Sequence, residues 1–220
     1  CDHRGLGRSE GLRGHVSDFG TYARDLAAFV EHIGGTDLPQ VVYGHSMGGL
    51  IAIEYVAEHA EGLAGVVLSA PGIRLFRPPS RWTLRFGRFF AAFLPLLPMP
   101  PGIDPEGISS DPAVAVASKK DRMMTKRVSL RWMLEFVGAQ GRVEGFARRI
   151  ELPTLILQGT ADGVIEPAGA ADLAEWIPAE DVTLRTFPDG RHELHNEVPA
   201  LRIPAMDAVA EWFDARWNGA

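Results

Sequence analysis

Short runs of consecutive apolar residues alternate along the chain with longer stretches in which apolar residues recur at helical spacing. The runs predict three strands, at residues 41–43, 66–68 and 155–157, and residues 182–187 give a fourth. The first three are uninterrupted by polar residues, which is typical of strands covered on both faces of a parallel sheet. The helical spacing predicts helices at residues 18–32, 47–60, 166–177 and 198–216. This order predicts an α/β fold, a mostly parallel sheet with helices on both faces.

One segment, residues 71–150, interrupts the alternation. It is about 80 residues long, whereas ordinary connections have ~2 to 6, so it must have structure of its own. We expect a helical cap inserted into an α/β core that consists of residues 1–70 and 151–220. Residues 72–150 hold fourteen Lys and Arg against six Asp and Glu, although the whole chain has a net charge of -6. The cap surface therefore favours anionic or interfacial partners.

Composition excludes several classes of protein. With 46% hydrophobic and 23% charged residues, the chain is neither disordered, collagen-like nor a coiled coil. Its longest uncharged apolar stretch, residues 89–103, contains four prolines and is too short and too kinked to span a bilayer. The acidic remainder and the lack of any recognised nucleic-acid motif exclude nucleic acid as a partner.

The single cysteine, Cys1, cannot form an internal disulfide, and no cysteine and histidine cluster has zinc-ligand spacing. We therefore expect no structural metal. The sequence begins at Cys1 rather than at Met, so any signal peptide precedes the residues shown. We expect a cytoplasmic protein with peripheral membrane contact through the cap.

Residues Gly44 to Gly48 fit the pattern G-x-S-x-G where a predicted strand meets a predicted helix. A serine in this context sits in a sharp, strained turn that presents its hydroxyl above the sheet. The helix directs its N-terminus at the same point, so the backbone N–H of Met47 can donate to a developing oxyanion. The alternative is a glycine-rich turn that only packs strand against helix. The context favours Ser46 as a nucleophile.

A serine nucleophile needs a base, and in this fold the chain order is serine, acid, histidine. Two histidines follow the third predicted strand. His192 comes just after the fourth strand and a Pro-Asp-Gly turn, and we predict it to be the base. His195 lies three residues later, where the next helix is expected to begin, and is interpreted as a structural residue.

The acid that orients the base should follow the carboxyl end of a strand, where ligands and catalytic loops collect in open α/β sheets. Asp162 follows the third predicted strand and fits best, with Glu166 on the same loop as the reserve candidate. Three other aspartates fit less well, because they lie within a helix, before a strand or in the turn next to His192: Asp172, Asp181 and Asp189.

Residues 74–94 of the cap carry aromatic side chains at helical spacing, with a neighbouring stripe of arginines. The aromatic residues are Trp82, Phe86, Phe89, Phe90 and Phe93, and the arginines are Arg81, Arg85 and Arg88. One interpretation is a lid helix whose aromatic face touches acyl chains or a membrane while the arginines meet anionic headgroups. The other is a cap helix buried against the body with solvated arginines. Both stay open. The candidate substrate-binding residues are His45, Trp82, Phe86, Phe89 and Phe90.

Four segments, in this order, resemble successive motifs of the monoacylglycerol lipase and lysophospholipase family of α/β hydrolases. They are residues 2–9 (DHRGLGRS), 44–49, 159–162 and 192–195, and cap residues 109–112 and the region of Asp121 are also similar. The resemblance covers nearly the whole chain. It implies Ser46 as nucleophile, Asp162 as acid and His192 as base.

Two features depart from that family. Leu6 stands where members usually carry histidine, which bears on the support of the active-site floor. Family members also have further strands, a helix and an oxyanion loop before the position of Cys1. We therefore expect the sheet to lack its N-terminal part, and the second oxyanion donor to lie upstream of Cys1.

These observations predict a serine hydrolase that cleaves esters of single-chain lipids, monoacylglycerol or lysophospholipid, through an acyl-enzyme and without a cofactor. The alternatives are a short-chain carboxylesterase, an aminopeptidase-like amidase and a non-catalytic binding protein of the same fold. The predicted triad argues against the last of these.

Overall fold

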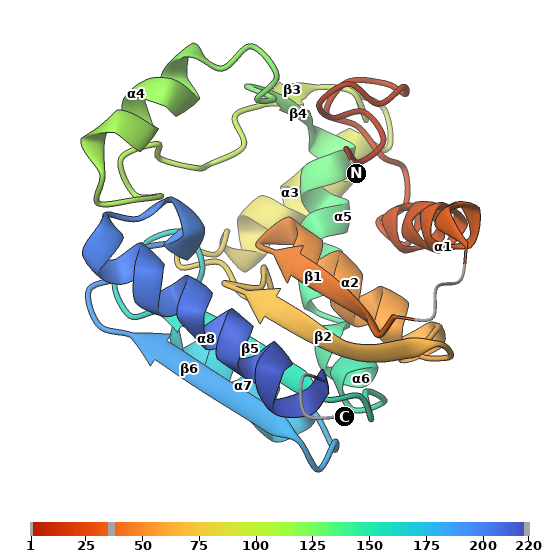
Figure 1. Ribbon diagram of the computed structural model, residues 1–220. Helices are drawn as coiled ribbons and strands as arrows, with labels where there is room; N and C mark the ends of the chain where they lie inside the picture. Colours follow the sequence, from red (N-terminus) through yellow and green to blue (C-terminus); the bar gives the residue numbers. More distant parts are fainter. Residues whose placement is uncertain (1, 35–37, 218–220) are drawn as a thin grey trace.

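The computed structural model describes residues 2–34 and 38–217, so Cys1 lies outside the described residues (Figure 1). Its main sheet has four parallel strands in the order β1-β2-β5-β6. The strands are β1 (Gln40–His45), β2 (Leu63–Ser69), β5 (Thr154–Gly159) and β6 (Val182–Phe187). All four were predicted from the sequence, and the predicted α/β fold with a parallel sheet is confirmed.

Helices cover both faces of this sheet because its central strands carry apolar side chains on both faces, Val66 to Leu68 in β2 and Leu155 to Leu157 in β5. Along β2, Val66 and Leu68 join one hydrophobic cluster while Val67 between them joins another, as the period of two in a strand requires. The first cluster includes residues of α1 (Thr21–Ile33), α2 (Met47–Glu58) and α7 (Ala168–Trp176). The second is closed by α8 (Pro199–Trp217), which crosses the front of the sheet in Figure 1.

The segment from residue 71 to residue 150 contains four helices and a short antiparallel pair of strands. They are α3 (Arg81–Ala91), β3 (Pro98–Met99), α4 (Pro112–Lys120), β4 (Val128–Ser129), α5 (Leu130–Gln140) and α6 (Val143–Ala147). Side-chain oxygens of Ser80, Asp111 and Ser129 accept from amides in the first turns of α3, α4 and α5. These N-caps fix where the three helices begin.

Part of this segment belongs to the core of the molecule. Trp132 and Phe136 of α5 are buried in the first cluster together with Tyr22 of α1, and the indole N–H of Trp132 donates to the Tyr22 hydroxyl at 2.9 Å. Val143 and Ala147 of α6 are buried in the same cluster. Helices α5 and α6 therefore join this segment to the core, and the predicted division into a cap at residues 71–150 and a separate core stays a prediction.

Strand β1 lies at an edge of the described sheet, and Tyr43 on it is 46% exposed. Beside it a groove of about 440 Å³ is lined mostly by apolar side chains of α1, β1 and α2, including Leu26, Phe29 and Val42. In residues 2–34 and 38–217, no helix is both long enough and apolar enough to cross a membrane.

Candidate active site

Ser46 occupies a strained turn between β1 and α2. Its backbone has φ 54° and ψ -121°, a conformation that costs a non-glycine residue on the order of 1–3 kcal/mol and persists only where neighbours enforce it. The Ser46 amide donates to the carbonyl of Ser69 at 3.0 Å, and the Ser46 carbonyl accepts from the Gly72 amide at 2.7 Å. Both partners come from the end of β2 and the turn after it. The neighbouring strand therefore holds the serine in place.

The two outer glycines of the turn are required by the close approach of strand and helix. A Cβ on Gly44 would lie 2.6 Å from the carbonyl oxygen of Gly48. A Cβ on Gly49 would lie 2.8 Å from the Cα of Pro71. These separations are shorter than any real Cβ contact, so the sharp turn depends on Gly44, the first glycine of the pattern G-x-S-x-G, and on Gly49, which follows the pattern.

The three residues predicted as a triad form one chain of hydrogen bonds. His192 Nε2 lies 2.8 Å from Ser46 Oγ, and His192 Nδ1 lies 2.8 Å from Asp162 Oδ2. His192 is 3% exposed and Asp162 is 1% exposed. The residues follow the carboxyl ends of β1, β5 and β6, so the sheet brings together side chains that are far apart in the sequence.

The carboxylate of Asp162 is held by more than the histidine. Its Oδ1 accepts from the amides of Val164 and Ile165 at 2.8 and 2.9 Å. Its Oδ2 also accepts from the side-chain amide of Gln158 at 3.1 Å. Burial by itself raises the pKa of Asp162, but the hydrogen bond and charge of His192 and the two amides outweigh it, so the pKa lies below its ordinary value. Asp162 is therefore a carboxylate at neutral pH.

Gln158 is a site residue that the sequence interpretation missed. The signal available was a polar residue inside the otherwise apolar run of β5, four positions before Asp162. The reserve acid Glu166 takes no part in the hydrogen bonds that link Ser46, His192 and Asp162. Its backbone amide donates to the carbonyl of Arg74, and His192 bonds Asp162 instead.

Comparison of the sequence and the structure with known proteins shows the family to which the chain belongs. A family model described as "Serine aminopeptidase, S33" matches residues 1–199. The chain belongs to this family of α/β hydrolases. This match and the relatives described next confirm the expected resemblance to α/β hydrolases of the monoacylglycerol lipase kind.

Relatives of this S33 hydrolase include monoglyceride lipase of Rattus norvegicus, 33% identical over 221 residues, which cover 98% of this chain and 72% of the relative. Monoacylglycerol lipase of Mycolicibacterium smegmatis is 31% identical over 216 residues, 96% of this chain and 76% of the relative. Among solved structures, monoacylglycerol lipase of Paleococcus ferrophilus superposes with a TM-score of 0.86 at 27% identity, covering 96% of this chain and 80% of that one.

Two further histidines, His45 and His195, lie near His192, the histidine predicted as the base. The ring centroid of His45 lies 4.9 Å from that of His192 and 4.8 Å from that of His195. Burial, reinforced by the two neighbouring imidazoles, lowers the pKa of His45 to about 3, so this ring stays neutral. A contact of His45 with substrate stays a prediction.

His195 lies in a short 3₁₀ helix, Leu194–Asn196, which precedes α8. The expectation that His195 begins the next helix is corrected accordingly, since α8 begins only at Pro199. Burial lowers the pKa of His195, and within the described part of the chain its Nδ1 has no hydrogen-bond partner. The hydrogen bonds to Ser46 and Asp162 go to His192, the histidine that sequence position favours.

The start of α2 at Met47 leaves the first amides of this helix without intrahelical acceptors, next to the Ser46 hydroxyl. The role of the Met47 amide as an oxyanion donor stays a prediction. The second predicted donor, upstream of Cys1, lies outside the described residues.

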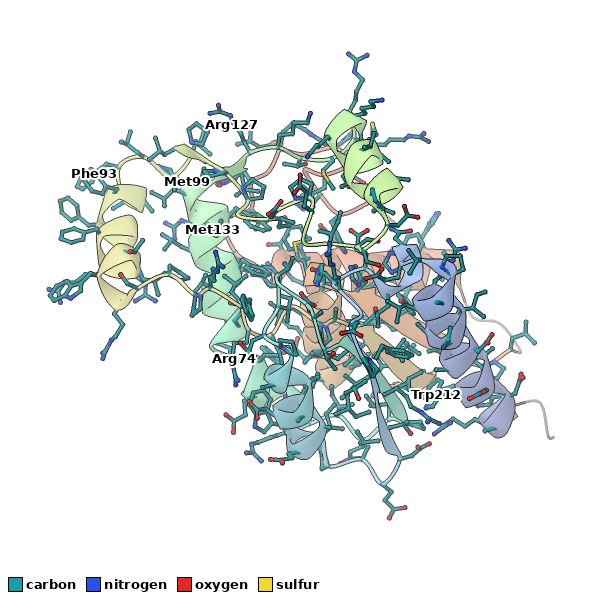
Figure 2. The ribbon with its side chains drawn as sticks, turned by 90° about the vertical axis from the view of Figure 1, so that its left-hand side faces the viewer. Arg74, Phe93, Met99, Arg127, Met133 and Trp212 are labelled. Carbon is teal, nitrogen blue, oxygen red and sulfur yellow. The ribbon has the colours of Figure 1, made fainter. Side chains whose placement is uncertain are left out.

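The predicted aromatic helix of the cap is α3, and its aromatic side chains lie on its outer side. Trp82, Phe86, Phe89 and Phe90 are 49% to 68% exposed. The helix packs on α5 through a narrow face, where Gly87 approaches side chains of Leu130 and Leu134. Figure 2 shows α3 at the periphery, with Phe93 directed away from the sheet. In the described part of the cap these rings contact one another rather than the triad, so their contact with substrate stays a prediction.

No group of three or more histidine, cysteine, aspartate or glutamate side chains in residues 2–34 and 38–217 could hold a metal ion.

Proposed function

We propose that this S33 hydrolase cleaves the carboxylic ester of single-chain lipids, with monoacylglycerol as its substrate, through an acyl-enzyme. The observation that carries the proposal is the continuous hydrogen-bonded chain from Ser46 through His192 to Asp162 on a strained elbow. Relatives at 31% and 33% identity are named monoacylglycerol lipase and monoglyceride lipase, which supports the choice of substrate.

In the first half of the reaction, Ser46 Oγ attacks the ester carbonyl carbon while His192 Nε2 takes the hydroxyl proton. Asp162 stabilises the imidazolium that forms. The negative charge on the carbonyl oxygen develops at the N-terminus of α2, where the Met47 amide donates to it. The tetrahedral intermediate then breaks the bond to the glycerol oxygen, and that oxygen receives the proton from His192. Glycerol leaves, and the acyl group stays on Ser46.

In the second half, water replaces the serine hydroxyl as the attacking group. His192 takes a proton from the water as its oxygen attacks the acyl carbon, and the bond between this carbon and Ser46 Oγ breaks. The proton returns to Ser46, and the fatty acid leaves. Asp162 keeps His192 in the tautomer that both halves need, because its carboxylate accepts from Nδ1 and leaves Nε2 free to take a proton.

Hydrolysis of a lysophospholipid, a short-chain ester or an amide would use the same three residues, Ser46, His192 and Asp162. The family description names an aminopeptidase, and a relative at 25% identity is named phospholipase YtpA. We favour monoacylglycerol because the relatives above 30% identity carry that name.

Two measurements test the function. A fluorophosphonate probe is expected to label the protein and to leave Ser46→Ala unlabelled, since only an activated serine reacts. A panel with one acyl chain on glycerol, on glycerophosphocholine, as a p-nitrophenyl ester and as an anilide is expected to give the highest kcat/KM on the glycerol ester. Labelling of Ser46→Ala would remove the serine assignment. Preference for the anilide would replace the esterase by an amidase, and absence of labelling would favour a binding protein.

We also propose that α3 contacts the surface of a lipid aggregate or membrane. Its exposed rings would enter the acyl region, and the exposed side chains of Arg81, Arg85 and Arg88 would meet anionic headgroups. A shallow cleft of about 570 Å³ on α3 is lined by these arginines, Trp82 and Leu84. We propose a cytoplasmic location for the protein.

A further inference from the structure

The residue before His192 is fastened to the cap. Nη1 of Arg191 donates to the backbone carbonyl of Glu106 at 2.5 Å and to that of Ser109 at 2.8 Å. Both carbonyls belong to the segment that leads into α4, and Figure 1 shows this part of the cap next to the beginning of α8. One side chain next to the proposed base thus bonds the cap backbone twice.

The residues after His192 are fastened to the same segment. The amide of Glu193 donates to the carbonyl of Ile108 at 2.7 Å, and the hydroxyl of Ser109 donates to the carbonyl of Asn196 at 2.8 Å. Ile108 and Ser109 are 2% and 3% exposed. The cap therefore forms hydrogen bonds with residues on both sides of His192, while the imidazole itself bonds only Ser46 and Asp162 among the described residues.

Glu197 lies at the centre of these contacts between residues 106–110 of the cap and residues 191–198, which we call the junction. The residue is fully buried, and its Oε1 accepts from the amide of Arg191 at 2.8 Å. Its Oε2 accepts from the amide of Ser110 at 2.9 Å and also from the Ser110 hydroxyl. The amide of Val198 completes the set at 3.3 Å. One oxygen therefore faces the residue before His192, and the other faces the cap.

The donors around Glu197 are those that a buried carboxylate needs in order to stay charged. Burial by itself raises the pKa of Glu197, but the Ser110 hydroxyl and the amides of Arg191, Ser110 and Val198 outweigh it and leave the pKa below its ordinary value. Two of these donors come from Ser110 in the cap. A cap that moves away would leave a buried charge with fewer partners, so the carboxylate and the cap segment hold each other in place.

We propose that Glu197 is a positioning residue that couples the seating of the cap to the placement of His192 against Ser46. When residues 106–110 are seated on Glu197, the loop that carries His192 is fixed and its Nε2 reaches the serine. When residues 106–110 move away from Glu197, the loop becomes more mobile and His192 Nε2 no longer lies within hydrogen-bond distance of Ser46 Oγ. The inference rests on the proposed role of His192 as the base. Because a misplacement of about 1 Å can cost ~100-fold in rate, the cap acts on chemistry as well as on substrate access.

The test removes the Ser110 hydroxyl, one of the two donors that the cap directs at Glu197, and measures the turnover of a small soluble ester. Ser110→Ala deletes one donor to Glu197, Ser110→Thr keeps a hydroxyl there, and Glu197→Gln removes the charge. Ser118→Ala removes a hydroxyl from α4 outside the junction and is the matched control. We expect Ser110→Ala to lower kcat by ~10- to 100-fold with KM unchanged, to label more slowly with a fluorophosphonate but to the same final extent, and Ser110→Thr to recover most of the rate.

The outcomes separate the two proposals. If the unaltered protein does not react with the probe, the proposed function fails. If it reacts, and folded Ser110→Ala turns over and labels as fast as the Ser118→Ala control, the coupling is overturned even where the melting temperature falls. Should Glu197→Gln fail to fold, Ser110→Ala and its threonine rescue still decide the matter, because Ser110 is only partly buried and its loss leaves the Arg191 amide bonded to Glu197.

Discussion

The imidazole rings of His45 and His192 have their centroids 4.9 Å apart, so the residue before the elbow serine contacts the histidine that this serine bonds. Two imidazolium ions at this distance would repel each other in a buried site, and a neutral His45 avoids that cost. The pKa of His45, lowered to about 3, keeps the ring neutral when His192 takes up a proton.

This contact predicts a pH dependence of stability. The folded pKa of His45, about 3, lies below its ordinary value of 6.5, so between these values the unfolded chain binds the additional proton. The free energy of unfolding therefore falls as pH falls through this window. His45→Gln should flatten this fall, measured as the urea midpoint at several pH values. An unchanged acid dependence in the variant would show that other groups cause it.

The choice between the two histidines predicts unequal losses of activity. His192→Ala should reduce kcat by ~10⁴-fold or more, because both the base and the proton carrier are lost. His195→Ala should reduce it by only ~10- to 100-fold, in the range found when a supporting residue beside a functional group is removed. Ser46→Ala is the inactive reference. The assignment of the base is wrong if His195→Ala is as inactive as that reference.

The hydrogen bond from Gln158 to Asp162 predicts that Gln158→Met lowers kcat more than it lowers the melting temperature. Its side-chain amide donates to Asp162, while its Oε1 is buried and, among the described residues, has no hydrogen-bond partner. Gln158→Met takes away the donor and the unpaired oxygen together, so the two stability effects largely offset each other. We expect little change in melting temperature, a rise in the pKa of Asp162, and a fall in kcat of ~10-fold. A fall in stability without a fall in kcat would contradict this role for Gln158.

The tight turn at residues 44–49 predicts that a substitution at Gly44 lowers the free energy of unfolding, whereas a matched control substitution at Gly145 does not. Gly44→Ala would drive a methyl group against the carbonyl of Gly48 and the Cβ of Ala52, and overpacking of this kind costs about 1–3 kcal/mol or more. At the exposed position Gly145 of α6, a Cβ meets no atom within 4 Å, so Gly145→Ala should be neutral or stabilise by about 0.4–1 kcal/mol. Urea unfolding of both variants measures the difference. Equal stabilities would mean that the elbow relaxes.

The strands of the sheet, and the residues Ser46, Asp162 and His192 that form the hydrogen-bonded chain, could be picked out from the sequence because both depend on local patterns. The apolar run that became β5 and the loop that places Asp162 after it are visible in a few consecutive residues. By contrast, the bonds of Glu197 to Ser110 join positions 87 residues apart, and the burial of Trp132 depends on its contact with Tyr22 of α1. Side-chain contacts of this range leave no periodic signal, so neither the junction nor the merging of α5 with the core was predicted.

The exposed face of α3 predicts binding that depends on lipid charge. Trp82 and Phe89 are 68% and 63% exposed, an unusual arrangement for rings of this size unless a partner covers them. Vesicles with anionic lipid should bind more protein in sedimentation than neutral vesicles do, and the difference should fade towards 1 M salt, where the screening length falls to ~3 Å. Replacing Arg81, Arg85 and Arg88 together by Gln should abolish the difference but leave the binding to neutral vesicles.

A second variant separates the rings from the charges on the same helix. Phe89→Ser together with Phe93→Ser removes apolar area from the outer side of α3 and from the turn that follows it. All three arginines stay, so binding should weaken on neutral and anionic vesicles alike. Hydrolysis of a soluble short-chain ester is the control, because neither set of residues touches the triad and its rate should stay constant in both variants. If vesicle binding of the unaltered protein is insensitive to lipid charge, the arginines are a solvated face. If the serine variants bind as well as the unaltered protein, the rings of α3 do not enter the lipid.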